Sequence, residues 1–430
     1  MNGFNNFMER YFMPIAGKMA EQRHLKAIRD GIISTMPLLI IGSIFLIISS
    51  PPIESWAKFM EPYVATLNIP VDATFGILGL VAVFSIAYSL AHSYKMDGLS
   101  AGVLSLAAFM MAAPHTEEGN IPLNLMGAEG LFIAIVLAIF TVEVYRFFET
   151  KNIVIKMPDT VPPSVWWAFT ALLPGAAIIF IVWGVDVILG ATVDLSLHEI
   201  IGTVLREPLQ LIGGSLWGAL IAIFIIHLLW AFGIHGISVV ASIMAPIWYS
   251  LTDANVAAQK AGEELPYIIG QPFMAIWFAV GGSGMALALA ILFVWRARSK
   301  HLKNLGKMSI WSSIFNISEP VIFGAPVVLN PLIIIPFIIV PLVVGTITYV
   351  SMSIGLVGKP YAIVPWTTPI PLSGILTTGD WRGGVLMVFN LLVSLGIYFP
   401  FFRLYDRKLL KDEEAFESEG SDKEDISQHA

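Results

Sequence analysis

Long apolar runs recur along the whole chain, and short polar segments separate them. A helix needs about 20 consecutive, mainly apolar residues to cross the hydrocarbon core of a bilayer. The apolar runs predict about ten transmembrane helices, at residues 28–49, 73–92, 98–113, 129–148, 163–190, 213–232, 235–251, 270–295, 332–354 and 383–402. The pattern therefore predicts an all-α polytopic membrane protein.

Three segments outside these runs are too polar to cross a bilayer. Residues 1–27 mix charged and apolar positions and predict an amphipathic cytoplasmic lead-in. Residues 193–211 carry charges between apolar positions at helical spacing, which predicts an amphipathic linker helix at the membrane interface. Residues 404–430 are an acidic cytoplasmic tail, which we expect to be disordered from Asp412 onward.

Two further apolar stretches, near 310–331 and 358–381, are interrupted by proline and glycine. Such residues prevent one smooth helix, and broken backbone at membrane depth is tolerated only where protein or a water-filled cavity covers it. We therefore expect two re-entrant hairpins, each of which returns to the side from which it entered. Both termini and most of the 24 Lys and Arg residues then lie on the cytoplasmic side, as the positive-inside rule requires.

The regular first half and the broken second half of the chain predict different roles. Residues 28–192 hold five regular spans, and we interpret them as a scaffold domain. Residues 212–403 contain both hairpins, and we interpret them as a substrate-transport domain. Discontinuous helices of this kind present half-helix ends and unwound backbone to the substrate in many transporters.

The composition narrows the class of function. The chain is 56% hydrophobic and 13% charged, which excludes an ordinary soluble domain. It has no cysteine, and therefore no disulfide, thiolate metal site or phosphocysteine of its own. It also has no P-loop, no His or carboxylate cluster at metal-ligand spacing and no long basic block. We expect no cofactor, no metal and no nucleic-acid partner.

Glu319 is the leading candidate for chemistry. It lies in an otherwise apolar stretch, 316–331, that proline and glycine interrupt. An ionisable group at membrane depth is costly and usually marks a substrate or ion path. The alternative is a structural carboxylate that caps a half-helix. Asn316, which opens the stretch, is a further candidate for substrate binding, whereas Glu129 and Glu143 lie at the ends of one span and are interpreted as structural.

His235 and a tryptophan–threonine motif complete the candidate site. His235 lies in a tight turn with glycine on either side, and it can orient a sugar hydroxyl or share its proton. The alternative is a satisfied histidine at a helix end. Trp366 offers a flat face for a sugar ring, and Thr367 and Thr368 offer hydroxyl groups. The alternative here is an interfacial tryptophan with threonines that cap broken backbone.

These motifs resemble those of a known family, the membrane-embedded EIIC subunit of the bacterial phosphoenolpyruvate-dependent sugar phosphotransferase system. The similar residues are Phe-Gly-Ile-His-Gly at 232–236, Asn-Ile-Ser-Glu-Pro-Val-Ile-Phe-Gly at 316–324 and Val-Pro-Trp-Thr-Thr-Pro at 364–369. The chain looks most like the lactose, cellobiose and N,N′-diacetylchitobiose branch. Many relatives carry Asn-Glu-Pro where this chain has Ser318 before Glu319, so the resemblance implies no amide contact at position 318.

The resemblance implies import of a β-linked disaccharide, with N,N′-diacetylchitobiose or cellobiose favoured, coupled to phosphorylation of the sugar 6-hydroxyl. Glu319 and His235 correspond to the family's Glu and His near that hydroxyl. The chain would be the membrane subunit of a sugar phosphotransferase whose donor is a phosphocysteine on a separate EIIB protein, which EIIA phosphorylates. Also implied are a homodimer in the bacterial cytoplasmic membrane, formed by the first five spans, and an elevator-like motion.

The basic run at 296–307 is a candidate docking surface for EIIB, although the positive-inside rule explains it equally well. Two other functions stay open on the residues alone. A proton-coupled secondary sugar transporter would use Glu319 and His235 as a proton-coupling pair. A membrane-embedded enzyme that acts on lipid-linked sugar is a more distant alternative. The products distinguish the three: a sugar phosphate, an unmodified sugar or a modified lipid.

Overall fold

The computed structural model describes residues 22–49, 54–115, 120–155, 157–158, 162–325, 327 and 330–428. Most of the predicted lead-in therefore lies outside the described residues. Every regular element in these ranges is a helix, which confirms the predicted all-α class. Seven of the described helices are long and apolar enough to cross a membrane, or eight if the bent pair Leu197–Gly213 and Leu216–Ala231 forms one span. Two shorter apolar helices, Gly98–Ala112 and Ser283–Arg296, fall on further predicted spans.

The helices pack into two compact units. The first unit contains Met1–Ser215 and Ile237–Gln271, and the second contains Leu216–Gly236 and Pro272–Ala430. The chain first passes from one unit to the other after Ser215, whereas the apolar pattern ends the linker at residue 211. Residues 237–271 differ from that pattern, because they pack with the first unit although the sequence places them in the transport domain. Packing between distant segments, and not order along the chain, assigns this segment.

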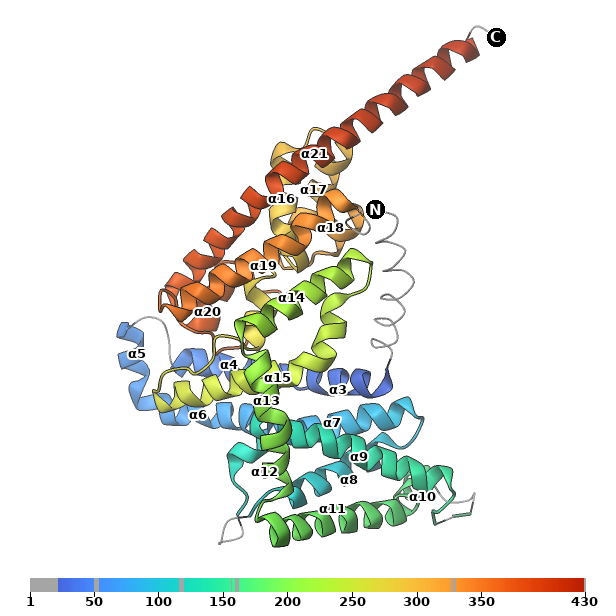
Figure 1. Ribbon diagram of the computed structural model, residues 1–430, viewed down its shortest axis with the longest axis vertical. Coiled ribbons are helices and arrows are strands. Elements are labelled where there is room, and N and C mark those ends of the chain that lie inside the picture. Colours follow the sequence, from blue (N-terminus) through green and yellow to red (C-terminus); the bar gives the residue numbers. More distant parts are fainter. Residues whose placement is uncertain are drawn as a thin grey trace. The chain divides into compact units, whose positions relative to one another are not determined.

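The first unit is a stack of helices. Helix α7 packs against α3, α8 and α9, and α11 packs against α8 and α9 (Figure 1). Gly31 on α3 permits the close approach to α7, since a Cβ there would lie 2.5 Å from the Ile86 side chain. The helices of this unit are α3 (Arg23–Ile33), α4 (Met36–Ser49), α5 (Glu54–Met60), α6 (Val64–Asp72), α7 (Leu78–Ser93), α8 (Gly98–Ala112), α9 (Leu131–Thr150), α10 (Pro163–Thr170), α11 (Leu172–Val193), α12 (Leu197–Ile201), α13 (Glu207–Gly213) and α15 (Gly236–Ala261).

The segment predicted as an amphipathic linker is helical, through α12, a short π-helix at Gly202–Arg206 and α13. Its start is capped by Ser196 and Glu199, which form a capping box. The apolar pattern missed α5 and α6, because residues 54–72 carry too many polar positions to score as a span.

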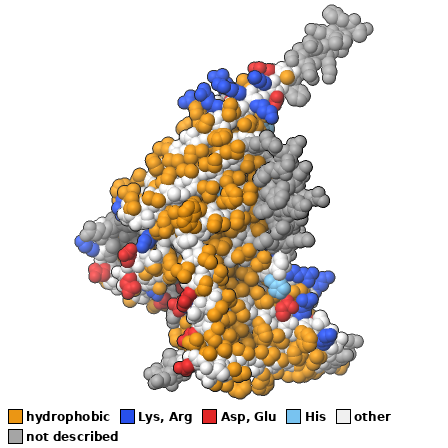
Figure 2. Space-filling view, viewed as in Figure 1, with side chains coloured by type: hydrophobic (Ala, Val, Ile, Leu, Met, Phe, Trp, Pro, Cys, Tyr) orange, Lys and Arg blue, Asp and Glu red, His pale blue; other side chains and the backbone are white. Residues whose placement is uncertain are grey.

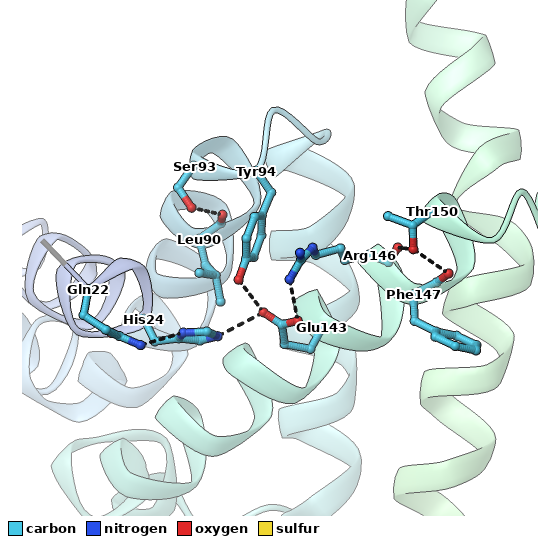
Figure 3. Close-up of polar contacts among 9 residues, drawn as sticks. All are labelled: Gln22, His24, Leu90, Ser93, Tyr94, Glu143, Arg146, Phe147 and Thr150. Atoms are coloured by element: carbon cyan, nitrogen blue, oxygen red, sulfur yellow. Dashed lines mark hydrogen bonds and ion pairs between the residues drawn. The ribbon is translucent and has the colours of Figure 1, made fainter. Parts of the chain in front are cut away.

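A polar cluster ties three helices of the first unit together at one end (Figure 3). The Glu143 carboxylate on α9 accepts hydrogen bonds from His24 Nε2 at 2.9 Å and from the Tyr94 hydroxyl at 2.7 Å. Arg146 donates to the same carboxylate at 3.2 Å, and its guanidinium lies 4.2 Å from the centre of the Tyr94 ring. These contacts give Glu143 a structural role.

The second unit is built around α19, which packs against α14 and α21 (Figure 1). Helix α16 packs against α17 and α21, and the short α18 packs against α17 and α16. The helices of this unit are α14 (Leu216–Ala231), α16 (Ala286–Arg296), α17 (Lys300–Ile314), α18 (Glu319–Gly324), α19 (Pro331–Ser353), α20 (Leu372–Thr378) and α21 (Trp381–Gln428).

The prediction of one continuous span at 270–295 is wrong. A five-residue π-helix, Phe273–Trp277, is followed by a break, and α16 begins only at Ala286. We call residues 278–285 the glycine loop. Its residues Gly281, Gly282 and Gly284 have φ of 80°, 91° and 72°, a left-handed conformation that glycine adopts without steric cost. Hydropathy does not register this break, because the flanking side chains are apolar.

The expectation of disorder from Asp412 onward is also wrong, since α21 continues to Gln428. Two carboxylates on α21, Asp406 before this extension and Glu413 within it, cap the start of α17. Asp406 accepts the N–H groups of Arg298 and Ser299, and Glu413 accepts those of Lys300 and His301. The first N–H groups of a helix have no partner within it, so these contacts favour both helices. Figure 2 shows Lys and Arg side chains gathered at this end of the second unit.

We predict that Gly284→Ala destabilises the protein far more than Gly355→Ala. Both glycines have positive φ, 72° and 73°, which costs any other residue roughly 1–2 kcal/mol. A Cβ at Gly355 meets nothing within 4 Å, whereas a Cβ at Gly284 would lie 2.1 Å from the Phe337 ring. Overpacking adds about 1–3 kcal/mol. Thermal unfolding in detergent measures the difference, and equal losses for the two variants would contradict the packing described here.

Candidate functional site

All the candidate residues lie in the second unit. Asn316 lies in the turn between α17 and α18, and Glu319 is the first residue of α18. Trp366, Thr367 and Thr368 lie on the non-helical segment that precedes α20. His235 lies in the turn between α14 and α15.

The first broken stretch folds as a helical hairpin of α17 and α18. The chain reverses at Asn316, whose φ of 63° is left-handed, a conformation that asparagine tolerates better than most residues. The His301 ring donates from Nε2 to the Gly324 carbonyl at 2.9 Å and so joins the start of α17 to the end of α18. Gly324 allows α18 to approach α17 closely, since a Cβ there would lie 2.3 Å from a terminal methyl group of Leu305, which would have to move. Pro326 of this stretch lies outside the described residues.

Glu319 is half-buried at the start of α18. Its carboxylate has no hydrogen-bond or ion-pair partner among the described residues, and α18 has no side-chain cap. The structural alternative requires the carboxylate to accept a backbone N–H of the half-helix. No such contact is present in the described part of the chain, which gives the capping alternative no support there.

The Trp366 segment, residues 358–371, is non-helical and turns at Trp366 and Thr367, and polar contacts hold its first part. Near its start, the Gly358 N–H donates to the Asp380 carboxylate at 3.0 Å. Further along, the N–H groups of Tyr361 and Ala362 donate to the Thr377 carbonyl of α20. Trp366 is 49% exposed, so a large part of this residue is accessible.

Asn316 connects these two broken segments. Its Nδ2 donates to the Trp366 carbonyl at 2.6 Å and to the Thr368 carbonyl at 3.2 Å. Its Oδ1 accepts the Gly281 N–H of the glycine loop at 2.8 Å. The structure therefore brings Asn316, Trp366 and Thr368 together and commits the Asn316 amide to backbone groups.

His235 is exposed, and its ring stacks at a tilt on Trp230, with centroids 4.6 Å apart. Trp230 in turn contacts Phe323 of α18, with ring centroids 6.4 Å apart. Trp230 thus joins the His235 turn to the helix that begins at Glu319. Sequence reasoning gave this residue no role, although it lies two residues before the motif at 232–236.

Sequence reasoning also missed the glycine loop and the residues that form hydrogen bonds with it. The buried His227 ring donates from Nδ1 to the Ile223 carbonyl at 2.7 Å and accepts the Gly284 N–H on Nε2 at 3.0 Å. A ring that donates from one nitrogen and accepts on the other is neutral. The Tyr398 hydroxyl donates to the Gly284 carbonyl. The run of Gly281, Gly282 and Gly284 in an apolar segment is the signal that could have predicted this loop.

Known proteins resemble this chain along nearly its full length. A sequence model of the family described as "Phosphotransferase system, EIIC" matches residues 29–341. The lichenan permease IIC component of Bacillus subtilis is 51% identical, with 97% of each chain covered. The cellobiose-specific EIIC component of Geobacillus stearothermophilus is 48% identical, with 96% of this chain and 97% of the relative covered.

A solved structure shares the fold. It is the crystal structure of the transporter ChbC, the IIC component from the N,N′-diacetylchitobiose-specific phosphotransferase system. The TM-score is 0.91 at 46% identity, and the match covers 95% of this chain and 99% of that chain.

We predict that His227→Phe lowers stability, because the buried Gly284 N–H loses its acceptor while the ring volume is retained. An unsatisfied buried donor costs roughly 1–3 kcal/mol. Tyr398→Phe is the matched variant, because it removes the hydroxyl that donates to the Gly284 carbonyl. Both variants should unfold at lower temperature than the wild type in detergent. A wild-type unfolding temperature for His227→Phe would contradict the role of this ring.

Proposed function

The chain belongs to the EIIC family of the phosphotransferase system, and on that premise we propose that it imports a β-linked disaccharide and couples import to phosphorylation of the sugar 6-hydroxyl. Cellobiose and N,N′-diacetylchitobiose are the favoured sugars. They match the names of the cellobiose-specific relative and of the structural neighbour. The observation that carries the proposal is Glu319, a half-buried carboxylate on a broken helix with no partner among the described residues.

In the proposed reaction, Glu319 accepts the proton of the 6-hydroxyl while that oxygen attacks the phosphoryl group of an EIIB phosphocysteine. The O–P bond forms, the S–P bond breaks and the cysteine leaves as a thiolate. His235 orients the hydroxyl, and its stacking on Trp230 supports that placement. A positioned base of this kind contributes typically about 10²- to 10⁴-fold to a rate.

Sugar binding is assigned to the Trp366 segment. The exposed ring offers a face for a pyranose, and Thr367 and Thr368 offer hydroxyl groups beside it. Asn316 completes the proposed set through its hydrogen bonds to the Trp366 and Thr368 carbonyls. The segment is anchored to α20 and to Asp380, which supports a rigid sugar platform rather than a mobile loop.

The proposed partners follow from the family. EIIB supplies the phosphoryl group, and EIIA phosphorylates EIIB again. The basic end of the second unit is the proposed EIIB surface, at Arg296, Arg298, Lys300, Lys303 and Lys307. We further propose that the first unit forms a homodimer, that the second unit moves as an elevator with re-entrant hairpins, and that both termini are cytoplasmic. Membership of this family and the apolar helices make the chain a multi-pass membrane protein.

We predict that Glu319→Gln reduces phosphotransfer about 10²- to 10⁴-fold and weakens sugar binding much less, because the amide keeps the shape of the side chain but cannot accept the proton. Sugar phosphate formed from phospho-EIIB by membrane vesicles measures the rate, and titration of the purified variant measures binding. Phosphotransfer at the wild-type rate would remove Glu319 from the mechanism.

The vesicles also test the proton-coupled alternative. Vesicles without EIIA and EIIB should not accumulate unmodified sugar when a pH gradient is imposed. Accumulation under these conditions would favour a secondary transporter, in which Glu319 and His235 carry the coupled proton.

We predict that cellobiose or N,N′-diacetylchitobiose binds the purified protein roughly tenfold or more tightly than lactose. Lactose differs in the axial 4-hydroxyl of its non-reducing ring, and a site built for an equatorial hydroxyl leaves buried polar groups unpaired with the other epimer. Calorimetric titration of the three sugars gives the order directly. Tighter binding of lactose would overturn the sugar assignment but not the coupling to phosphorylation.

A further inference from the structure

The glycine loop is fixed in place by side chains from packed helices. His227 on α14 and Tyr398 on α21 hold the N–H and the carbonyl of Gly284. The Ser283 N–H donates to the Ser318 hydroxyl at 3.2 Å. The backbone position of the glycine loop is therefore set by α14, by α21 and by the turn between α17 and α18, all of which lie within the second unit.

Asn316 connects the glycine loop to the Trp366 segment by hydrogen bonds. Its Oδ1 is held by the glycine loop at Gly281, and its Nδ2 holds the carbonyls of Trp366 and Thr368. A side-chain amide has two N–H donors and one carbonyl oxygen. Both donors and the oxygen are thus engaged by backbone groups, which leaves this amide little capacity to bind a sugar directly.

Resting on the proposed function, we infer that Asn316 is a positioning residue for sugar affinity, and that it acts by holding the Trp366 segment at the distance where the ring stacks on the sugar. Glu319 governs the chemical step, and Asn316 governs binding. Loss of the Asn316 donors therefore raises the sugar concentration needed for half-maximal phosphotransfer and largely preserves the rate at saturation.

Asn316→Asp is the sharpest variant. It keeps the size of the side chain, its tolerance of positive φ and an acceptor for Gly281, but the ionised carboxylate has no donor for Trp366 and Thr368. We expect cellobiose or N,N′-diacetylchitobiose to bind roughly 10- to 100-fold more weakly. The rate of phosphotransfer from phospho-EIIB at saturating sugar should change only a few-fold.

Acidification supplies a readout that a merely structural defect would not give. The protonated carboxyl of the Asn316→Asp variant regains one O–H donor, so its sugar affinity relative to wild type should recover as pH falls. Asn316→Gly keeps the left-handed backbone and has no side-chain donor at any pH, so its affinity should be weak without recovery. Thermal unfolding shows whether Asn316→Asp folds. If it does not fold, the affinity loss is measured with Asn316→Gly instead.

A double-mutant cycle with Trp366→Ala separates positioning from direct contact. If Asn316 acts through Trp366, Asn316→Asp adds little to the affinity loss of Trp366→Ala. Additive losses, or wild-type affinity in Asn316→Asp, would overturn the inference. Ser312→Ala is the matched control, because it removes a hydroxyl of the same hairpin whose hydrogen bond goes to the Ser309 carbonyl and to neither the glycine loop nor the Trp366 segment, and it should bind sugar like wild type. Failure of the proposed function would appear separately, as normal phosphotransfer in Glu319→Gln.

Discussion

Backbone N–H and C=O groups that a broken helix leaves open must find partners wherever water is excluded, and the second unit is organised by that requirement. The glycine loop exposes such groups between the π-helix and α16. His227 on α14, Asn316 and Ser318 in the turn between α17 and α18, and Tyr398 on α21 provide partners for these groups. Polar side chains in an apolar unit thus serve first to complete backbone hydrogen bonding, and this frame positions the candidate site.

Two carboxylates show how structural and chemical roles differ. Glu143 in the first unit accepts hydrogen bonds from His24, Tyr94 and Arg146, so its charge is satisfied within the fold. Glu319 in the second unit is half-buried and has no such partner among the described residues. The desolvation of an unpaired carboxylate costs stability unless a ligand or solvent compensates for it. The contrast supports a functional role for Glu319 and a structural one for Glu143.

The sequence predicted most of the regular architecture because each span depends on local composition. Proline and glycine also located both broken stretches, at 310–331 and 358–381. The same reasoning failed at 270–295, since a hydropathy window weighs side chains and does not weigh the positive φ of clustered glycines. It failed again after Asp412, where contacts of Glu413 with the start of α17 favour the helix.

By itself the sequence determined the membrane class and the broken stretches, and it indicated Glu319, His235 and Trp366 as candidate site residues. These follow from hydropathy, backbone chemistry and the rarity of ionisable groups in apolar runs, all of which are local properties. Only the tertiary structure decided that residues 237–271 pack with the first unit and that Asn316 holds the backbone of Trp366. Such contacts join residues far apart along the chain, and their hydrogen-bond geometry exists only once the helices have packed.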